Sequence, residues 1–153
     1  MDQQRRDALR IYTVLGLALA AGLIEPSAAL AQASGRAAFD AKSVNEALKA
    51  MGSIVGAAST DVVIDAPDIA ENGASVPFGV SAMLPNVQQI AILIEKNPNP
   101  LSANFLIPPG TEGSVSTRLK LAESSRVHAL VKADGKWLLA TKDIKVTLGG
   151  CGG

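Results

Sequence analysis

The chain has one cysteine and one histidine, and its 14 Lys and Arg side chains are balanced by 14 Asp and Glu. A single cysteine excludes an internal disulfide, so the fold must be held by its hydrophobic core. A single histidine and a single cysteine are too few to complete a zinc site. With no net charge, the protein has no electrostatic field that would attract nucleic acid or an anionic membrane surface.

Sequence signatures of common catalytic sites are also absent. The chain contains neither a Gly-x-Ser-x-Gly nucleophile elbow nor a glycine-rich phosphate-binding loop. Its histidine, His128, falls within a predicted strand on the face opposite Val127 and Ala129. A lone histidine in such a place is usually a surface or boundary residue. These features predict that the protein is not an enzyme.

Four acidic residues lie close together in the sequence: Asp61, Asp65, Asp68 and Glu71. Carboxylates bind hard cations such as calcium, so a cation site is one interpretation. Their spacing does not follow a recognised calcium-binding loop, which favours a solvated turn instead. We therefore expect no metal ion and no organic cofactor.

The N-terminal residues 1–33 read as an export signal and not as part of the fold. A basic segment that ends at Arg10 is followed by an apolar run of 14 residues, Ile11–Ile24. A membrane-spanning helix needs about 20 apolar residues, so this run has the length of a signal sequence. The small residues that follow predict cleavage after Ala31, with cleavage after Ala33 as the alternative.

The segment Arg5–Arg10 contains paired arginines and resembles a twin-arginine signal, which exports folded proteins. Gln4 and Ala8 depart from the usual pattern, and an ordinary secretory signal remains the alternative. Either signal predicts a periplasmic protein. The remainder, residues 34–148, is the right size for one domain with one core. It contains no apolar stretch long enough to span a membrane.

One helix is predicted at the start of this domain. The segment Phe39–Met51 has apolar residues at helical spacing. Ser43 and Glu46 form a capping-box pattern, although a start nearer Asp40 is the alternative. Gly52 stands where a glycine commonly ends a helix.

After this helix the hydrophobic period changes to two, as in β-strands. Pro77 suggests that the early part of one strand lies at a sheet edge, and Asp134-Gly135 predicts a tight hairpin. Seven or so short strands separated by turns favour an antiparallel, immunoglobulin-like β-sandwich. The candidate segments are Val62–Ile64, Val76–Leu84, Ile90–Ile94, Asn104–Ile107, Val115–Leu121, Arg126–Lys132, Trp137–Ala140 and Ile144–Leu148.

The last five residues place the only cysteine, Cys151, between two pairs of glycines: Gly149, Gly150, Gly152 and Gly153. Glycine loses more backbone entropy on ordering than any other residue, so residues 149–153 are predicted to form a flexible arm that presents the thiol. An unperturbed thiol has a pKa of about 8.5 and is only partly ionised at neutral pH. The nearest cation in the sequence is Lys145, so activation of the thiol is expected to come from partner proteins.

This tail resembles that of the SoxY family, the sulfur-carrier subunits of the bacterial Sox sulfur-oxidation system. The segments Ala66–Gly73, Val76-Pro77 and Glu95–Pro100 agree with the resemblance, which runs from about Phe39 to Gly153. It implies a carrier that holds sulfur intermediates covalently on its tail cysteine.

The resemblance also implies partners. The subunit would form a heterodimer with SoxZ, a second small β-sandwich protein. A c-type cytochrome complex would join thiosulfate to Cys151, a hydrolase would release sulfate, and a molybdenum–haem sulfur dehydrogenase would oxidise the remaining sulfane. Exposed apolar residues on an edge strand, with Phe78 and Phe105 as candidates, could bind SoxZ.

Two other functions remain open at this point. One is a ubiquitin-like carrier that would use the carboxylate of Gly153 as a thiocarboxylate. That chemistry requires a cytosolic activating enzyme, so the export signal argues against it. The other is a structural module that is crosslinked through Cys151.

Overall fold

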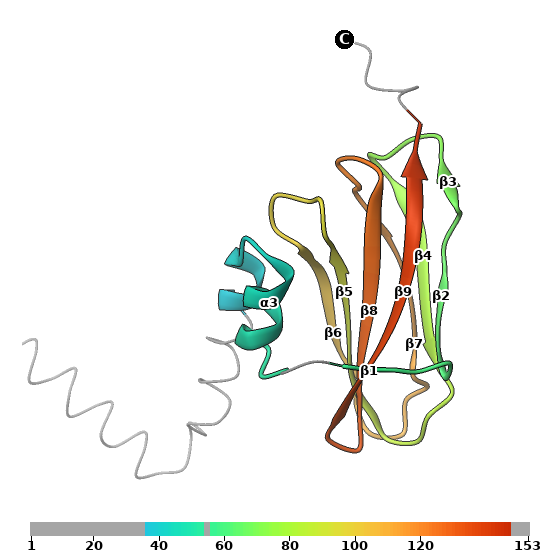
Figure 1. Cartoon of the computed structure of the whole chain (residues 1–153). Helices are drawn as coiled ribbons and strands as arrows, with labels where there is room; N and C mark the ends of the chain where they lie inside the picture. The colour runs from blue at the N-terminus through green and yellow to red at the C-terminus, as the bar shows by residue number, and fades with distance from the viewer. Residues whose placement is uncertain (1–35, 54–55, 148–153) are drawn as a thin grey trace, which may run out of the picture. The chain divides into compact units, whose positions relative to one another are not determined.

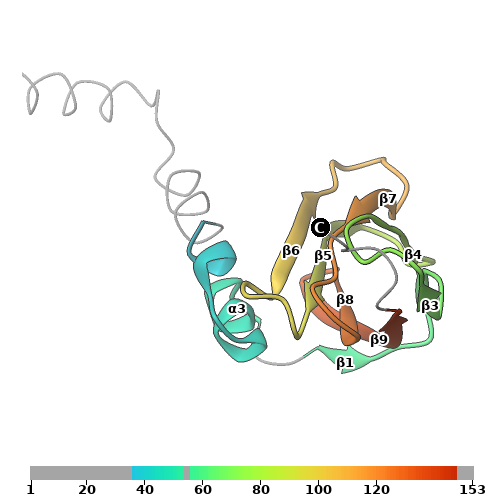
Figure 2. The same ribbon diagram turned by 90° about the horizontal axis from the view of Figure 1, so that it is seen from above.

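A computed structural model describes residues 36–53 and 56–147 of the chain. Within them, two β-sheets pack face to face (Figures 1 and 2). One sheet has the order β1-β9-β8-β5-β6, with β3 also paired to β9, and the other has the order β2-β4-β7. The strands are β1 Ala57–Ala58, β2 Val62–Asp65, β3 Ile69–Ala70, β4 Val76–Ala82, β5 Val87–Ile94, β6 Leu101–Leu106, β7 Ser114–Leu119, β8 Ser125–Ala133 and β9 Lys136–Val146.

The predicted mainly-β sandwich is therefore confirmed, and the predicted signal (1–33) and arm (149–153) lie outside the described residues. Most strand pairs are antiparallel, as expected. The sequence did not predict β1 and β3, which pair in parallel with β9. Each of them has only two residues, so neither shows a hydrophobic alternation that could be recognised.

The core between the sheets is formed by alternate residues of the longer strands. In β4, Val76, Phe78 and Val80 are buried. Phe78 is only 1% exposed, so its prediction as a surface residue for SoxZ binding was wrong. Its strand, β4, is the central strand of the smaller sheet, and its side chain faces the larger sheet. Phe105, on the edge strand β6, is half-buried against the same core.

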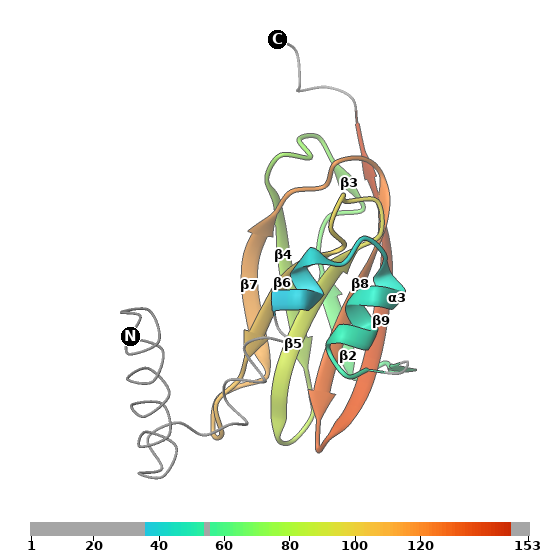
Figure 3. The ribbon, with the colours of Figure 1, turned by 90° about the vertical axis from the view of Figure 1, so that its left-hand side faces the viewer.

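Strand β5 is buried along both of its faces, which explains its continuous apolar run. Ile90 and Ile92 belong to the core between the sheets. Ala91 and Leu93 belong to a second cluster, which includes the helix residue Ala47. The helix therefore covers the outer face of the larger sheet, as Figure 3 shows.

The helix α3 spans Val44–Ala50 and begins as predicted. The Ser43 hydroxyl accepts a hydrogen bond from the Glu46 amide at 3.2 Å. The Glu46 carboxylate in turn accepts one from the amide of Lys42 at 2.9 Å. The segment 36–40 is also helical and is separated from α3 by residues 41–43. Gly52, with φ of 73°, follows the C-cap and ends the helix as predicted.

The predicted strand Trp137–Ala140 and the predicted strand that starts at Ile144, as far as Val146, are parts of one strand, β9. The residues between them, 141–143, are polar. Lys142 lies opposite the core residue Val127, but its long side chain reaches out of the sandwich to the carboxylate of Asp68 at 3.0 Å. A lysine can therefore occupy a core-facing position without breaking the strand.

Two further local predictions, one about a turn and one about a strand edge, are also confirmed. Asp134 and Gly135 both have positive φ, 48° and 74°, as a two-residue hairpin between β8 and β9 requires. β2 pairs with β4 only from Gly79 onward, so the part of β4 that contains Pro77 is paired with β7 alone. A proline is tolerated there because one side of the strand has no neighbouring strand to which an amide would have to donate a hydrogen bond.

Candidate functional site

The predicted site itself, Cys151 and the glycines around it, lies outside the described residues. The structure does describe the point from which this arm leaves the domain, the end of β9. The last described residue, Thr147, precedes Cys151 by four residues. Residues 145–147 are here called the arm root, because their contacts determine where the predicted arm begins.

On one side, the arm root is bonded to the segment that contains β3. The amide of Lys145 donates to the carbonyl of Asp68 at 2.9 Å. The amide of Thr147 donates to the carbonyl of Ala70 at 3.0 Å. The short parallel pairing of β3 with β9 therefore continues to the last described residue of the chain.

On the other side, the arm root is bonded to a serine side chain. The amide of Val146 donates to the Ser124 hydroxyl at 2.9 Å, and this hydroxyl donates to the carbonyl of Val146 at 3.4 Å. The backbone ladder between β8 and β9 ends at Ser125 and Ile144. Beyond this pair, the hydroxyl of Ser124 takes the place of a backbone partner for Val146. It thus extends the hydrogen bonding between β8 and β9 by one residue pair.

The connection between β7 and β8, residues 120–124, is held by a glycine from the Glu-Asn-Gly segment. The amide of Leu121 donates to the carbonyl of Gly73 at 2.8 Å. A Cβ atom on Gly73 would lie 2.5 Å from the carbonyl oxygen of Leu121 and 3.0 Å from a methyl group of Val146. Only glycine permits the backbone to approach this closely.

The same connection is also held by the Asn-Pro-Asn-Pro segment. The side chain of Asn97 donates to the carbonyl of Lys120 at 2.8 Å and accepts from the amide of Ala122 at 3.0 Å. The side chain of Asn99 donates to the carbonyl of Phe39 at 2.6 Å and so reaches the helical segment 36–40. The two asparagines tie this loop to two different parts of the domain.

Segments that are far apart in the sequence therefore meet at the end of the sandwich where β9 ends (Figures 1 and 3). Both motif segments bind the connection 120–124, and Ser124 of that connection binds the arm root. Sequence reasoning identified the motifs but missed Ser124, because a serine before a strand carries no distinguishing signal. Lys145, the nearest cation in the sequence to Cys151, is exposed on β9.

We expect Gly73→Ala to lower the free energy of unfolding by about 1–3 kcal/mol, the usual cost of forcing extra atoms into a packed site. The physical reason is the collision of the new methyl group with the carbonyl of Leu121. Gly110→Ala is a suitable control, because Gly110 has free space around it and only a positive φ of 80° to strain an alanine. Urea unfolding of both variants would test this, and a Gly73→Ala variant as stable as the unmodified protein would contradict it.

His128 has an acidic partner that the sequence did not reveal. Its Nε2 lies 2.7 Å from a carboxylate oxygen of Glu95, and its side chain is only 12% exposed. The pairing of β5 with β8 brings the two residues together, with Leu93 opposite His128. The prediction that His128 faces away from Val127 and Ala129 is confirmed, since those two belong to the inner core. The pair borders a cavity of about 500 Å³ beside α3.

The four acids of the candidate cation site do not form a cluster. Asp68 is paired with Lys142 at 3.0 Å, and Asp61 accepts a hydrogen bond from the hydroxyl of Ser59 at 3.2 Å. In residues 36–53 and 56–147, no group of three or more His, Cys, Asp or Glu side chains is placed to hold a metal ion. This arrangement favours the solvated-turn interpretation.

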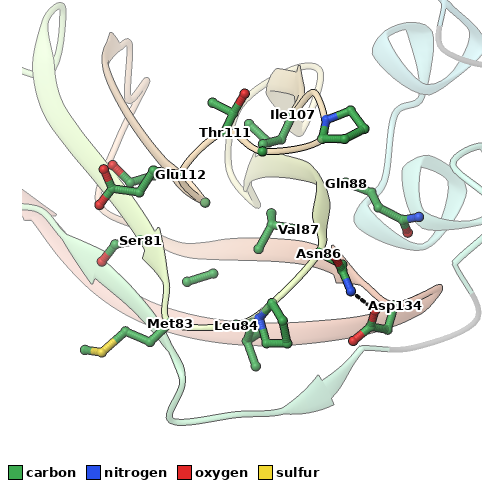
Figure 4. A pocket seen from close by; sticks show the side chains of 16 residues that line it. Ser81, Met83, Leu84, Asn86, Val87, Gln88, Ile107, Thr111, Glu112 and Asp134 are labelled. Carbon is green, nitrogen blue, oxygen red and sulfur yellow. Dashed lines mark hydrogen bonds between the residues drawn. The ribbon is translucent and has the colours of Figure 1, made fainter.

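A cavity of about 970 Å³ lies at the end of the sandwich away from the arm root (Figure 4). Met83 and Ile107 supply apolar surface there, and Asn86 donates a hydrogen bond to Asp134 of the β8–β9 hairpin at 2.9 Å. The cavity is remote from the arm root.

None of the helices in the part of the chain that the structure describes has the length and apolar character needed to cross a membrane.

Comparison with known proteins gives matches to a family model and to solved structures. The family model described as "Sulfur oxidation protein SoxY" matches residues 47–151. The sulfur carrier protein SoxY from Chlorobium limicola f thiosulfatophilum is 36% identical, with a TM-score of 0.63. That match covers 71% of this chain and 96% of the Chlorobium chain. A search of curated proteins found no match.

A second kind of solved structure shares the fold. The superoxide reductase (neelaredoxin) from Ignicoccus hospitalis is 23% identical, with a TM-score of 0.51. The match covers 56% of this chain and 80% of that chain. At this level of identity the likeness shows a common β-sandwich and nothing about chemistry.

Proposed function

Because the chain belongs to the SoxY family of sulfur oxidation proteins, we propose that it is a sulfur carrier that holds its cargo on Cys151. The observation that carries the proposal is the extent of the family match, which runs to residue 151 and so includes the tail cysteine. The domain before it offers a supported arm root. In this proposal the chain is a substrate of partner enzymes and not itself an enzyme.

The proposed cargo chemistry begins with the formation of a disulfide-type bond. The thiol of Cys151 and the outer sulfur of thiosulfate join, one proton is released, and two electrons pass to a c-type cytochrome complex. Water then attacks the sulfonate group, sulfate leaves, and Cys151 keeps the outer sulfur as a persulfide. A sulfur dehydrogenase would oxidise that sulfane sulfur where such an enzyme is present. Covalent attachment keeps each intermediate at high effective concentration for the next enzyme.

We also propose that the chain is exported by the twin-arginine route and works in the periplasm as a heterodimer with a SoxZ-like subunit. The paired arginines of the segment Arg5–Arg10 support this route, which carries folded proteins. A folded carrier could bring a signal-less partner with it. Crosslinking through Cys151 would block the proposed cargo site, so a permanent disulfide dimer does not fit this function.

Mass spectrometry is expected to find the adduct on Cys151. The complex of the full chain with its SoxZ partner would be incubated with thiosulfate and the oxidised cytochrome complex, then digested and sequenced. We expect thiosulfate mass on the peptide that contains Cys151, and its removal by a reductant. Protein alkylated at Cys151 beforehand is the control and should stay unmodified. An adduct on the carboxylate of Gly153 would instead support a ubiquitin-like carrier.

A further inference from the structure

All three backbone amides of the arm root donate hydrogen bonds. Successive amides point to opposite sides of β9, toward β3 and toward β8 in turn. Lys145 and Thr147 donate to the carbonyls of Asp68 and Ala70, while Val146 donates to the hydroxyl of Ser124. On the side of β8, the backbone ladder has already ended at Ile144. Ser124 is therefore the group that holds β9 to the β8 side beyond that point.

The segment that carries Ser124 is itself fixed. It is anchored through Leu121, which is only 2% exposed and donates its amide to the carbonyl of Gly73. The side chain of Asn97 binds the same segment at both Lys120 and Ala122. Ser124 is exposed, but the connection on which it stands has bonds to two other loops.

We propose that Ser124 is a positioning residue for the sulfur-carrying arm, an inference that rests on the proposed function of Cys151. With Val146 bonded, the last residue with a described bond is Thr147, and the four residues from there to Cys151 can span at most about 14 Å. Without the hydroxyl, only the bonds of Lys145 and Thr147 to the β3 segment hold the arm root. Each time these bonds also open and β9 frays back to Ile144, seven residues separate Cys151 from the last ladder pair and can span about 24 Å. The thiol would then be spread over a larger volume around the docked domain.

The expected kinetic effect follows from this change in length. The effective concentration of the thiol at a partner's active site falls about twofold if the seven residues behave as a random coil, and about fivefold if they reach out fully. The surface on which the domain docks is unchanged. Ser124→Ala should therefore lower kcat for the carrier by about twofold to about fivefold and leave its KM unchanged.

The test uses the full chain in complex with its SoxZ partner, with thiosulfate and the purified c-type cytochrome complex as enzyme. Ser124→Thr keeps the hydroxyl and should restore kcat. Ser81→Ala is the matched control, since Ser81 lies in β4 beside the remote cavity. The reaction of Cys151 with a small thiol reagent should be equally fast in all variants, because a small molecule needs no particular arm position.

A spectroscopic measurement separates positioning from general loss of structure. Nitroxide labels would be placed on Cys151 and on a cysteine introduced for Ser116, an exposed residue of β7. Double electron–electron resonance should show a broader distance distribution in Ser124→Ala than in Ser124→Thr. Asn97→Ala should broaden it too, and the double variant should add little, because both substitutions release the same connection.

The inference is overturned if Ser124→Ala leaves the distance distribution unchanged, or broadens it without lowering kcat. It is also overturned if KM rises while kcat stays constant, since that would place Ser124 in a docking surface. Failure of the proposed function would look different. In that case Cys151→Ser would keep full activity, whereas the distance distributions would still report on the arm root.

Discussion

Cys151→Ser is expected to reduce thiosulfate-dependent cytochrome c reduction to the background of the assay. A serine hydroxyl cannot form the sulfur–sulfur bond that the proposed reaction requires, and no second cysteine exists in the chain to replace the thiol. The assay would contain the chain, a SoxZ subunit as its proposed partner and the other Sox proteins, and would follow reduced cytochrome c spectroscopically. The loss should be complete, because every later step of the proposed reaction acts on sulfur held at this position.

The same variant should keep its fold and its binding to the proposed SoxZ partner. Cys151 lies beyond Thr147, the last residue for which the structure describes contacts, and the buried core ends with Ile144. Thermal unfolding and size-exclusion chromatography with SoxZ should therefore match the unmodified protein. Ser124→Thr, treated in parallel, controls for a conservative change near the arm. Activity retained by Cys151→Ser would contradict the carrier function, whereas loss of SoxZ binding would show that the tail has a structural role.

Local sequence signals predicted the parts of the fold that depend on neighbouring residues. The cap at Ser43 and the hairpin at Asp134-Gly135 were found because each depends on a few consecutive residues with fixed backbone requirements. The alternation in β4 likewise follows from burial of one face. The tail motif, whose composition alone suggested presentation of a thiol, lies outside the described residues and stays a prediction.

The parts that the sequence could not predict depend on contacts between distant residues. Glu95 meets His128 only because β5 and β8 pair, and β3 pairs with β9 although the two are some 75 residues apart. The proposed positioning role of Ser124 depends on where the pairing of β8 with β9 ends, which the sequence does not show. The continuity of β9 was also missed, because the contact of Lys142 with Asp68 joins residues that are far apart in the sequence.

The second large expected effect is a loss of domain stability, because Phe78 is buried in the core. Phe78→Ala should lower the free energy of unfolding by about 3–5 kcal/mol, the usual cost of removing a buried phenylalanine. Its side chain is 1% exposed in the core between the sheets. A domain of this size has a total stability of about 5–15 kcal/mol, so the variant would lose about a fifth of it or more. Urea unfolding, followed by the fluorescence of the single tryptophan, Trp137, would measure the loss.

Two control variants decide between a core role and an interface role for Phe78. Leu106→Ala removes a side chain that is 77% exposed and should change stability by no more than about 0.5 kcal/mol. Phe105→Ala, at a half-buried position on the edge strand β6, should fall between the two. If Phe78 contacted SoxZ instead, its alanine variant would unfold normally and lose partner affinity. The opposite pattern, low stability with affinity preserved in the folded fraction, follows from a side chain that no partner can touch.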